Sequence, residues 1–275
     1  MYPFTQVDVF APGPRPGNPV AVVHDADGLT DEQMQTFANW TNLSETTFIQ
    51  RPTDPRADYR LRIFTPAKEL PFAGHPTLGS AYAWLSAGGT PHERDAVLQE
   101  CGVGLVRVRR SGDELAFAAP PLRRSGDPDP DTLAQALAAL GVAPDRVLAS
   151  NWVDNGPPWL AIHLASAADV LAVRPDFATL SLDLGIVGAH DAGGPADYEV
   201  RAFVPSPDVN EDPVCGSLNA GIARWFLDSG VATAGYTVRQ GTALGRDGRV
   251  TISVDGDTIW VSGACRAVII GSVDL

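Results

Sequence analysis

The sequence repeats itself, and the two copies of the pattern lie more than 130 residues apart. Residues 17–24 and 156–163 each give a turn followed by an apolar strand, with glycine first and histidine seven positions later. Residues 62–66 and 201–205 share the pattern Arg-x-Phe-x-Pro. A third match follows in the same order, because Gly74, Gly79 and Gly88 have the spacing of Gly216, Gly221 and Gly230. Repeats of this length indicate two related domains and not a solenoid.

Each copy alternates strands with an apolar helix, which predicts an α+β fold with a central helix wrapped by sheet. The two apolar helices are expected at residues 77–86 and 219–228, each ending before a glycine suited to a left-handed C-cap. Hairpins are expected to follow at 104–117 and 249–261. Further helices are expected at 30–40, 130–140 and 167–173. Thr30 and Gln33 fit a capping box at the start of the first of these.

A polar, proline-rich segment at residues 120–130 separates the copies and is the natural joint between domains. We therefore expect an N-terminal half over residues 1–120 and a C-terminal half over residues 130–264.

Composition excludes several classes of partner. Hydrophobic residues make up 44% and charged residues 19%, as in globular proteins. The formal net charge of −13 argues against nucleic acid or an anionic membrane as partner, but a small anionic substrate remains compatible with a locally positive pocket. No apolar run is long enough to span a bilayer, and residues 1–8 read as a strand and not as a signal peptide. Three cysteines without CxxC spacing favour a reducing cytoplasm.

The start of each apolar helix carries residues suited to binding an anion. Gly74 and His75 stand at the first helix, and Gly216 and Ser217 at the second, shortly after Asp212. Helix N-termini present backbone N–H groups and a partial positive charge, so two such ends facing one cleft would bind a carboxylate or a developing enolate. The alternative is structural: His75 and Ser217 as helix caps, and Asp212 as the start of a turn.

Glu45 is the candidate acid and base. It follows the first amphipathic helix and leads into an apolar strand, where a raised pKa would let it take and return a proton near neutral pH. Counting from the repeat glycines places Leu184 near the matching position of the second half, so only one half is expected to carry a carboxylate there. A lone glutamate of this kind also fits a surface position at the edge of a strand.

These segments together resemble the PhzF family. The motifs are the five segments 17–22, 42–46, 62–66, 69–77 and 211–217, and the resemblance runs from about residue 5 to the C-terminus. It implies the diaminopimelate epimerase-like fold, with two pseudo-symmetric domains, each a curled β-sheet or barrel around a central α-helix. In that fold the C-terminal strand, here 265–275, completes the first half. The family is typically homodimeric, uses no cofactor, and is best known for isomerising trans-2,3-dihydro-3-hydroxyanthranilate in phenazine biosynthesis.

The resemblance also implies roles for individual residues. Glu45 would be the general base and acid that moves a proton on a small unsaturated cyclic carboxylic acid. Asp212 and His75 would hold the amino and hydroxyl groups of the substrate and guide proton transfer. The carboxylate and polar edge of the substrate would be bound by Ser44, Gly74, Gly216 and Ser217.

Two positions distinguish this chain from related two-thiol epimerases. Those enzymes place a cysteine before the glycine at both helix starts, whereas this chain has Ala73 at the first and Cys215 at the second. Ala73 can supply no base, so racemisation between two thiols is not expected. Cys215 stands where family members often carry threonine, and it fits either a thiol with a lowered pKa at a helix N-terminus or a small buried residue.

Other chemistries find no support in the sequence. Residues 74–80 have P-loop-like glycines without a lysine, no GxGxxG follows a strand, and the five histidines lack metal-ligand spacing, so no metal or cofactor is expected. Two rival interpretations stay open. One is a ligand-binding protein that kept the fold but lost catalysis, and the other is an isomerase or lyase acting on another secondary metabolite.

Overall fold

The computed structural model describes residues 1–13, 16–112, 114–205 and 210–275. The chain divides into two compact units. Unit 1 comprises Met1–Ala118 together with Ser262–Leu275, and unit 2 comprises Ala119–Val261. The sequence had suggested halves at 1–120 with 265–275 and at 130–264. The last strand, β16 (Thr258–Val273), runs from unit 2 into unit 1.

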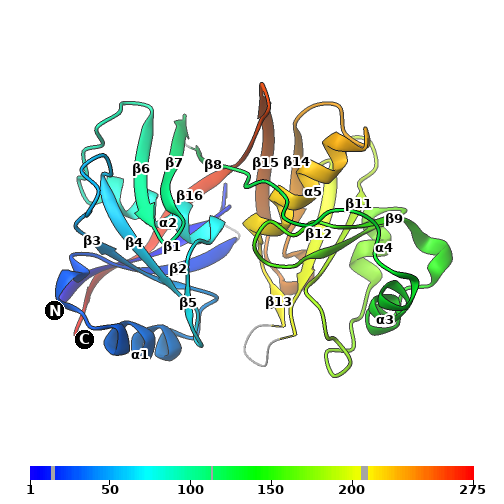
Figure 1. Cartoon of the computed structure of the whole chain (residues 1–275), viewed down its shortest axis with the longest axis horizontal. Coiled ribbons are helices and arrows are strands. Elements are labelled where there is room, and N and C mark those ends of the chain that lie inside the picture. Colours follow the sequence, from blue (N-terminus) through cyan, green and yellow to red (C-terminus); the bar gives the residue numbers. More distant parts are fainter. Residues whose placement is uncertain (14–15, 113, 206–209) are drawn as a thin grey trace. The chain divides into compact units, whose positions relative to one another are not determined.

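Unit 1 consists of strands around one buried helix, with a second helix on its outside (Figure 1). In chain order its elements are β1 (Tyr2–Val9), β2 (Asn18–Val23), a 3-10 turn (Ala26–Gly28), α1 (Asp31–Thr41), β3 (Thr46–Gln50), β4 (Tyr59–Phe64), β5 (Glu69–Leu70), α2 (Gly74–Ser86), β6 (Ala96–Cys101), β7 (Gly104–Ser111) and β8 (Glu114–Ala118).

The strands of unit 1 close around α2. Their order is β1-β2-β3-β4-β6-β7-β8-β16, and β16 also pairs with β1 in antiparallel register from Tyr2↔Val273 to Val9↔Cys265. Asp8 anchors this closure, because its carboxylate accepts hydrogen bonds from the Arg266 guanidinium at 3.0 Å and from the Gly17 backbone N–H at 2.8 Å. A closed sheet leaves no exposed edge where the pairing is complete.

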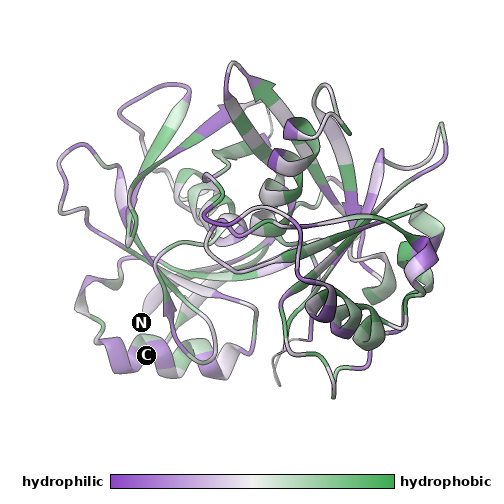
Figure 2. Cartoon of the chain, turned by 45° about the vertical axis from the view of Figure 1, so that its right-hand side comes forward, coloured by the Kyte–Doolittle hydropathy of each residue, from purple (hydrophilic) through white to green (hydrophobic). Residues whose placement is uncertain are grey.

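Helix α2 is buried along most of its length, from Gly74 to Ala81. Its glycines allow the close approach of the sheet: a Cβ added at Gly79 would lie 2.4 Å from Val20 Cγ1, and one at Gly74 would lie 2.5 Å from the Phe117 ring. The apolar residues of the strands supply the surrounding core, and Figure 2 shows the hydrophobic stretches on the strands and the hydrophilic ones on connecting loops and on α1.

Unit 2 repeats the same order of elements after an added helix. Its elements are α3 (Pro130–Leu140), a 3-10 turn (Pro144–Arg146), β9 (Val147–Trp152), β10 (Leu160–Leu164), α4 (Ala167–Ala172), β11 (Leu184–Ala189), β12 (Tyr198–Phe203), β13 (Glu211–Asp212), α5 (Gly216–Asp228), β14 (Tyr236–Gln240), a 3-10 turn (Thr242–Leu244) and β15 (Gly248–Asp255).

The strand pairings of the two units correspond one by one. β2 pairs with β3 in parallel, as β10 does with β11, and β4 pairs with β6 in parallel, as β12 does with β14. The antiparallel pairs β3–β4, β4–β5 and β6–β7 match β11–β12, β12–β13 and β14–β15. The two copies of the sequence pattern therefore build the same topology.

Most predicted helices were placed to within one residue, but the two central ones were predicted too short. α2 and α5 begin at Gly74 and Gly216, three residues before the predicted starts. Their predicted left-handed glycines are confirmed, with φ of 96° at Gly88 and 74° at Gly230. The predicted hairpin at 104–117 includes Asp113, which lies outside the described residues. Among the described residues, no helix is both long and apolar enough to cross a membrane.

Candidate active site

The two central helices begin differently from the outer ones. α1, α3 and α4 each start at a residue whose side chain accepts a backbone N–H of the first turn: Thr30, Asp129 and Ser166. α2 starts after Ala73 and α5 after Cys215, and in the described part of the chain neither makes such a side-chain cap. The first-turn N–H groups of a helix have no carbonyl partner within it. At α2 and α5 the N-cap side chain takes none of these donors, which suits binding of another group at the positive end of the helix dipole.

The start of α2 holds His75 against Glu45. His75 is buried with 3% of its surface exposed, and its Nδ1 lies 3.4 Å from Glu45 Oε2 and 3.5 Å from Asn18 Nδ2. Burial lowers the pKa of His75 to about 3, although the Pro19 carbonyl raises it in part. The imidazole is therefore neutral near pH 7, and it faces Glu45 as a hydrogen-bonding group and not as a counter-ion.

This burial predicts a pH dependence of stability. The unfolded chain protonates His75 near pH 6.5 and the folded chain only near pH 3, so the unfolded state binds more protons between these values. Stability is complete above pH 6.5 and falls as the pH drops toward 3. We expect His75→Asn to flatten this fall, measured as urea midpoint against pH. An equal slope in wild type and His75→Asn would contradict the burial argument.

Glu45 lies directly before β3 and is held by that strand. Thr46, the next residue, is fully buried and pairs with Phe64 of β4. The Thr41 hydroxyl donates to the Ala38 carbonyl and so accepts from the Thr46 hydroxyl at 2.7 Å, which ties the end of α1 to the start of β3. The Glu45 side chain keeps 14% of its surface exposed, so it is largely buried but still reaches solvent. Ser44, predicted to bind substrate, precedes it on the same half-buried turn.

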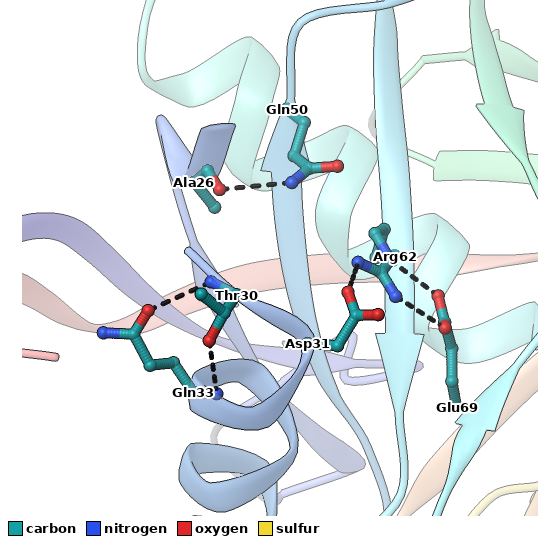
Figure 3. Close-up of polar contacts among 7 residues, drawn as sticks. All are labelled: Ala26, Thr30, Asp31, Gln33, Gln50, Arg62 and Glu69. Carbon is teal, nitrogen blue, oxygen red and sulfur yellow. Dashed lines mark hydrogen bonds and ion pairs between the residues drawn. The ribbon is translucent and has the colours of Figure 1, made fainter. Parts of the chain in front are cut away.

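An ion pair braces the segment that leads into α2. Arg62 of β4 donates two hydrogen bonds to Glu69 of β5, both at 2.7 Å, and one to Asp31 at the start of α1 at 2.6 Å (Figure 3). Glu69 stands five residues before Gly74. The motif Arg-x-Phe that repeats in the sequence therefore supplies an arginine that fixes the approach to the helix start.

Unit 2 contains an equivalent ion pair that is more deeply buried. Arg201 of β12 donates to both oxygens of Glu211 on β13, at 2.8 and 2.9 Å, and to the carbonyls of Val170 and Val173. Only 4% of the Arg201 side chain and 8% of that of Glu211 are exposed. Asp212 follows Glu211 on this short strand, so the ion pair fixes the backbone that carries it.

Gln240 joins Asp212 to the start of α5. This fully buried side chain donates to the Asp212 carbonyl at 3.1 Å and accepts from the backbone N–H of Cys215 at 3.2 Å and from Asn219 at 2.8 Å. The Asp212 carboxylate accepts the N–H of Val214 at 3.1 Å. Sequence reasoning missed Gln240, because its hydrogen bonds reach residues 21 to 28 positions away in the sequence.

Ser217 sits in the first turn of α5, where His75 sits in α2. Its Oγ accepts from the indole N–H of Trp159 at 3.0 Å and lies 3.3 Å from Cys215 Sγ. Cys215 is buried, with 5% of its surface exposed. The side-chain amide of Asn155 donates to the Ser217 carbonyl at 2.8 Å.

The strand register corrects one expectation. Thr46 pairs with Ala21 and Phe64, and Leu184 pairs with their repeat counterparts Leu160 and Phe203. Leu184 thus matches Thr46, and the residue that matches Glu45 is Asp183. The match expected from the glycine spacing was therefore wrong by one position, because the segment between the two parallel strands is one residue shorter in unit 2. Both units carry a carboxylate at this position, so the expected asymmetry is wrong.

The structure thus gathers the predicted residues into two sets, each within its own unit. Glu45 lies against His75 at the start of α2, with Ser44 and Gly74 beside them in the chain, and Asp212 lies shortly before Gly216 and Ser217 at the start of α5. Within the described ranges, no cluster of three His, Cys, Asp or Glu side chains could hold a metal ion. Each set combines a carboxylate, an uncapped helix start and a neutral polar side chain, which suits proton transfer beside a developing negative charge.

Comparisons with known proteins point to one family. The family model described as phenazine biosynthesis-like protein matches residues 7–271. Antisense-enhancing sequence 1 of Schizosaccharomyces pombe is 39% identical, over 98% of this chain and 97% of the relative. The trans-2,3-dihydro-3-hydroxyanthranilate isomerase of Pseudomonas aeruginosa is 34% identical, over 93% of this chain and 91% of the relative.

The fold is likewise shared with a solved structure. The crystal structure of a PhzF-family phenazine biosynthesis protein from Enterococcus faecalis superposes with a TM-score of 0.82 at 27% identity, and covers 100% of this chain and 99% of that one. The predicted α+β, diaminopimelate epimerase-like class is confirmed. The motifs, the fold and these matches lead to one conclusion: the chain belongs to the phenazine biosynthesis-like, or PhzF, family.

Proposed function

We propose that this PhzF-family isomerase moves a proton within a small unsaturated cyclic carboxylic acid, and that Glu45 carries the proton. The observation that supports this most is the pairing of Glu45 with a neutral, buried His75 at the uncapped start of α2. A cationic partner would hold the carboxylate as a stable ion pair, whereas a neutral imidazole leaves it able to accept a proton.

The proposed step needs no redox partner. Glu45 takes a proton from a carbon atom of the substrate, and the electrons of that C–H bond form a new double bond as the existing double bond shifts along the conjugated system. The protonated Glu45 then returns the proton to the carbon at the far end. Negative charge that develops on the substrate is stabilised by backbone N–H groups at a helix start.

The remaining residues would bind the substrate. Gly74, Gly216, Ser217 and Ser44 offer N–H and hydroxyl donors for its carboxylate and polar edge. Asp212 would accept from its amino group, and His75 would hold its hydroxyl group.

The substrate we propose is trans-2,3-dihydro-3-hydroxyanthranilate, because relatives at 34% identity are named as isomerases of this compound. The test is incubation of the protein with this compound in deuterated buffer, followed by proton NMR. We expect the signal of the C3 proton to disappear at an enzyme-dependent rate while isomer signals appear. An unchanged spectrum at stoichiometric protein would reject this substrate and favour another metabolite or a non-catalytic binding role.

A further inference from the structure

Asp183 occupies in unit 2 the place that Glu45 occupies in unit 1. Glu45 directly precedes β3, which pairs in parallel with β2, and Asp183 directly precedes β11, which pairs in parallel with β10. The registers of β3 with β4 and of β11 with β12 agree as well. The Asp183 carbonyl accepts the Leu160 N–H at 2.9 Å, so the backbone continues the ladder of β11.

The Asp183 side chain lies on the face of β11 that meets α5. Gly185, two residues later, shares this face, because side chains alternate along a strand. A Cβ added at Gly185 would lie 2.4 Å from Cδ1 of Leu218, in the first turn of α5. The corresponding face of β3 meets α2, since Thr47 is hydrogen-bonded to Ser80 at 2.8 Å. In both units a carboxylate therefore borders the side of the strand that packs on the central helix.

Asn155 supplies an independent observation at the same helix start. Its side chain is 7% exposed, and its amide donates to the Ser217 carbonyl at 2.8 Å. A carbonyl can only accept, so the atom facing it is Nδ2 and the remaining amide atom is the acceptor Oδ1. This Oδ1 is buried and has no hydrogen-bond partner among the described residues. Such an acceptor costs about 1–3 kcal/mol unless a ligand or water donates to it.

We propose that Asn155 Oδ1 and the Asp183 carboxylate form a subsite for the amino group of the substrate. Both groups accept hydrogen bonds, so the subsite selects a donor and disfavours a second carboxylate. An amino group carries two N–H donors and an ammonium three, and the Asp212 carboxylate already accepts the N–H of Val214, so further acceptors at this helix start would take the remaining donors. The inference rests on the proposed function for the identity of the substrate, but the subsite itself is defined by binding.

The test compares two aromatic probes that differ only in the amino group, 3-hydroxyanthranilate and 3-hydroxybenzoate. Isothermal titration calorimetry gives the Kd of each for the wild type, for Asp183→Asn and for Asp191→Asn. Asparagine keeps the shape of Asp183 but removes its charge. We expect the wild type and Asp191→Asn, an exposed control, to prefer 3-hydroxyanthranilate. In Asp183→Asn this preference should fall about tenfold or more, because asparagine offers a neutral acceptor in place of the charged one.

The 3-hydroxybenzoate arm monitors the fold. Its Kd and the thermal midpoint should be the same in Asp183→Asn and in the wild type. Two results would overturn the subsite: no preference for the amino compound in the wild type, or an equal preference in wild type and Asp183→Asn. Failure of the proposed function looks different, since the preference would then depend on Asp183 while the dihydro compound stayed unchanged in the NMR assay.

Discussion

Replacing Glu45 by glutamine is expected to lower kcat by about 10³-fold, within the range that a general base contributes. Glutamine has the shape of glutamate but cannot accept and return a proton at the working pH. Its amide can still hydrogen-bond His75, whose Nδ1 lies 3.4 Å from Glu45 Oε2, so the start of α2 should keep its geometry. The measurement is the initial rate of isomerisation, with Kd for 3-hydroxyanthranilate determined on the same protein.

A matched control exists in the same unit. Glu32 is exposed in the first turn of α1, and Glu32→Gln removes the same charge without touching the proposed site. We expect it to retain the wild-type rate. The proposal assigns the loss in Glu45→Gln to kcat and leaves Kd within about threefold, since the binding groups are untouched. Turnover by Glu45→Gln within tenfold of the wild type would remove Glu45 from the role of base.

The pH profile should separate Glu45 from His75. Burial holds the pKa of His75 at about 3, so this histidine does not titrate in the neutral range. An acid limb of kcat/KM above pH 4 then reports a carboxylate such as Glu45 and not the imidazole. His75→Asn should lower the rate without moving the midpoint of this limb.

The sequence was sufficient for the elements that local patterns encode. The capping box at Thr30 and Gln33 appears as predicted, with Thr30 Oγ1 accepting the Gln33 N–H at 3.2 Å (Figure 3). The predicted helices omitted the first three residues of α2 and α5, because glycine and proline are poor helix formers and Gly74-His75-Pro76 contains both. Proline is tolerated in a first turn, where its missing N–H has no partner within the helix anyway.

The residues of the candidate site that stand in sequence motifs could be proposed from the sequence. Those whose position depends on the pairing of strands could not. Glu45, His75 and Asp212 stand in segments that a resemblance can identify one by one. Asp183 stands in no such motif, and finding it requires knowing that Leu160 and Phe203 both pair with Leu184. Gln240 and Asn155 act through side-chain hydrogen bonds that reach across as many as 28 and 62 positions of sequence, which no local pattern contains.

The duplication also allows the buried ion pair of unit 2 to be tested against its counterpart in unit 1. Arg201 and Glu211 are 4% and 8% exposed, whereas Arg62 and Glu69 are 15% and 42% exposed. We expect Arg201→Met to lower the free energy of unfolding by about 3–5 kcal/mol, because it strands a buried carboxylate. Arg62→Met should cost about 1 kcal/mol, since water can solvate Glu69. Urea unfolding measures both.

A double variant distinguishes the stranded charge from lost packing. In Arg201→Met/Glu211→Leu no buried charge remains, so most of the lost stability should return. The return should be incomplete, because Arg201 also donates to the Val170 and Val173 carbonyls at 3.3 and 2.8 Å. If the double variant is as unstable as Arg201→Met alone, the cost comes from the lost packing of Arg201 and its lost hydrogen bonds to those two carbonyls, and not from a stranded charge on Glu211.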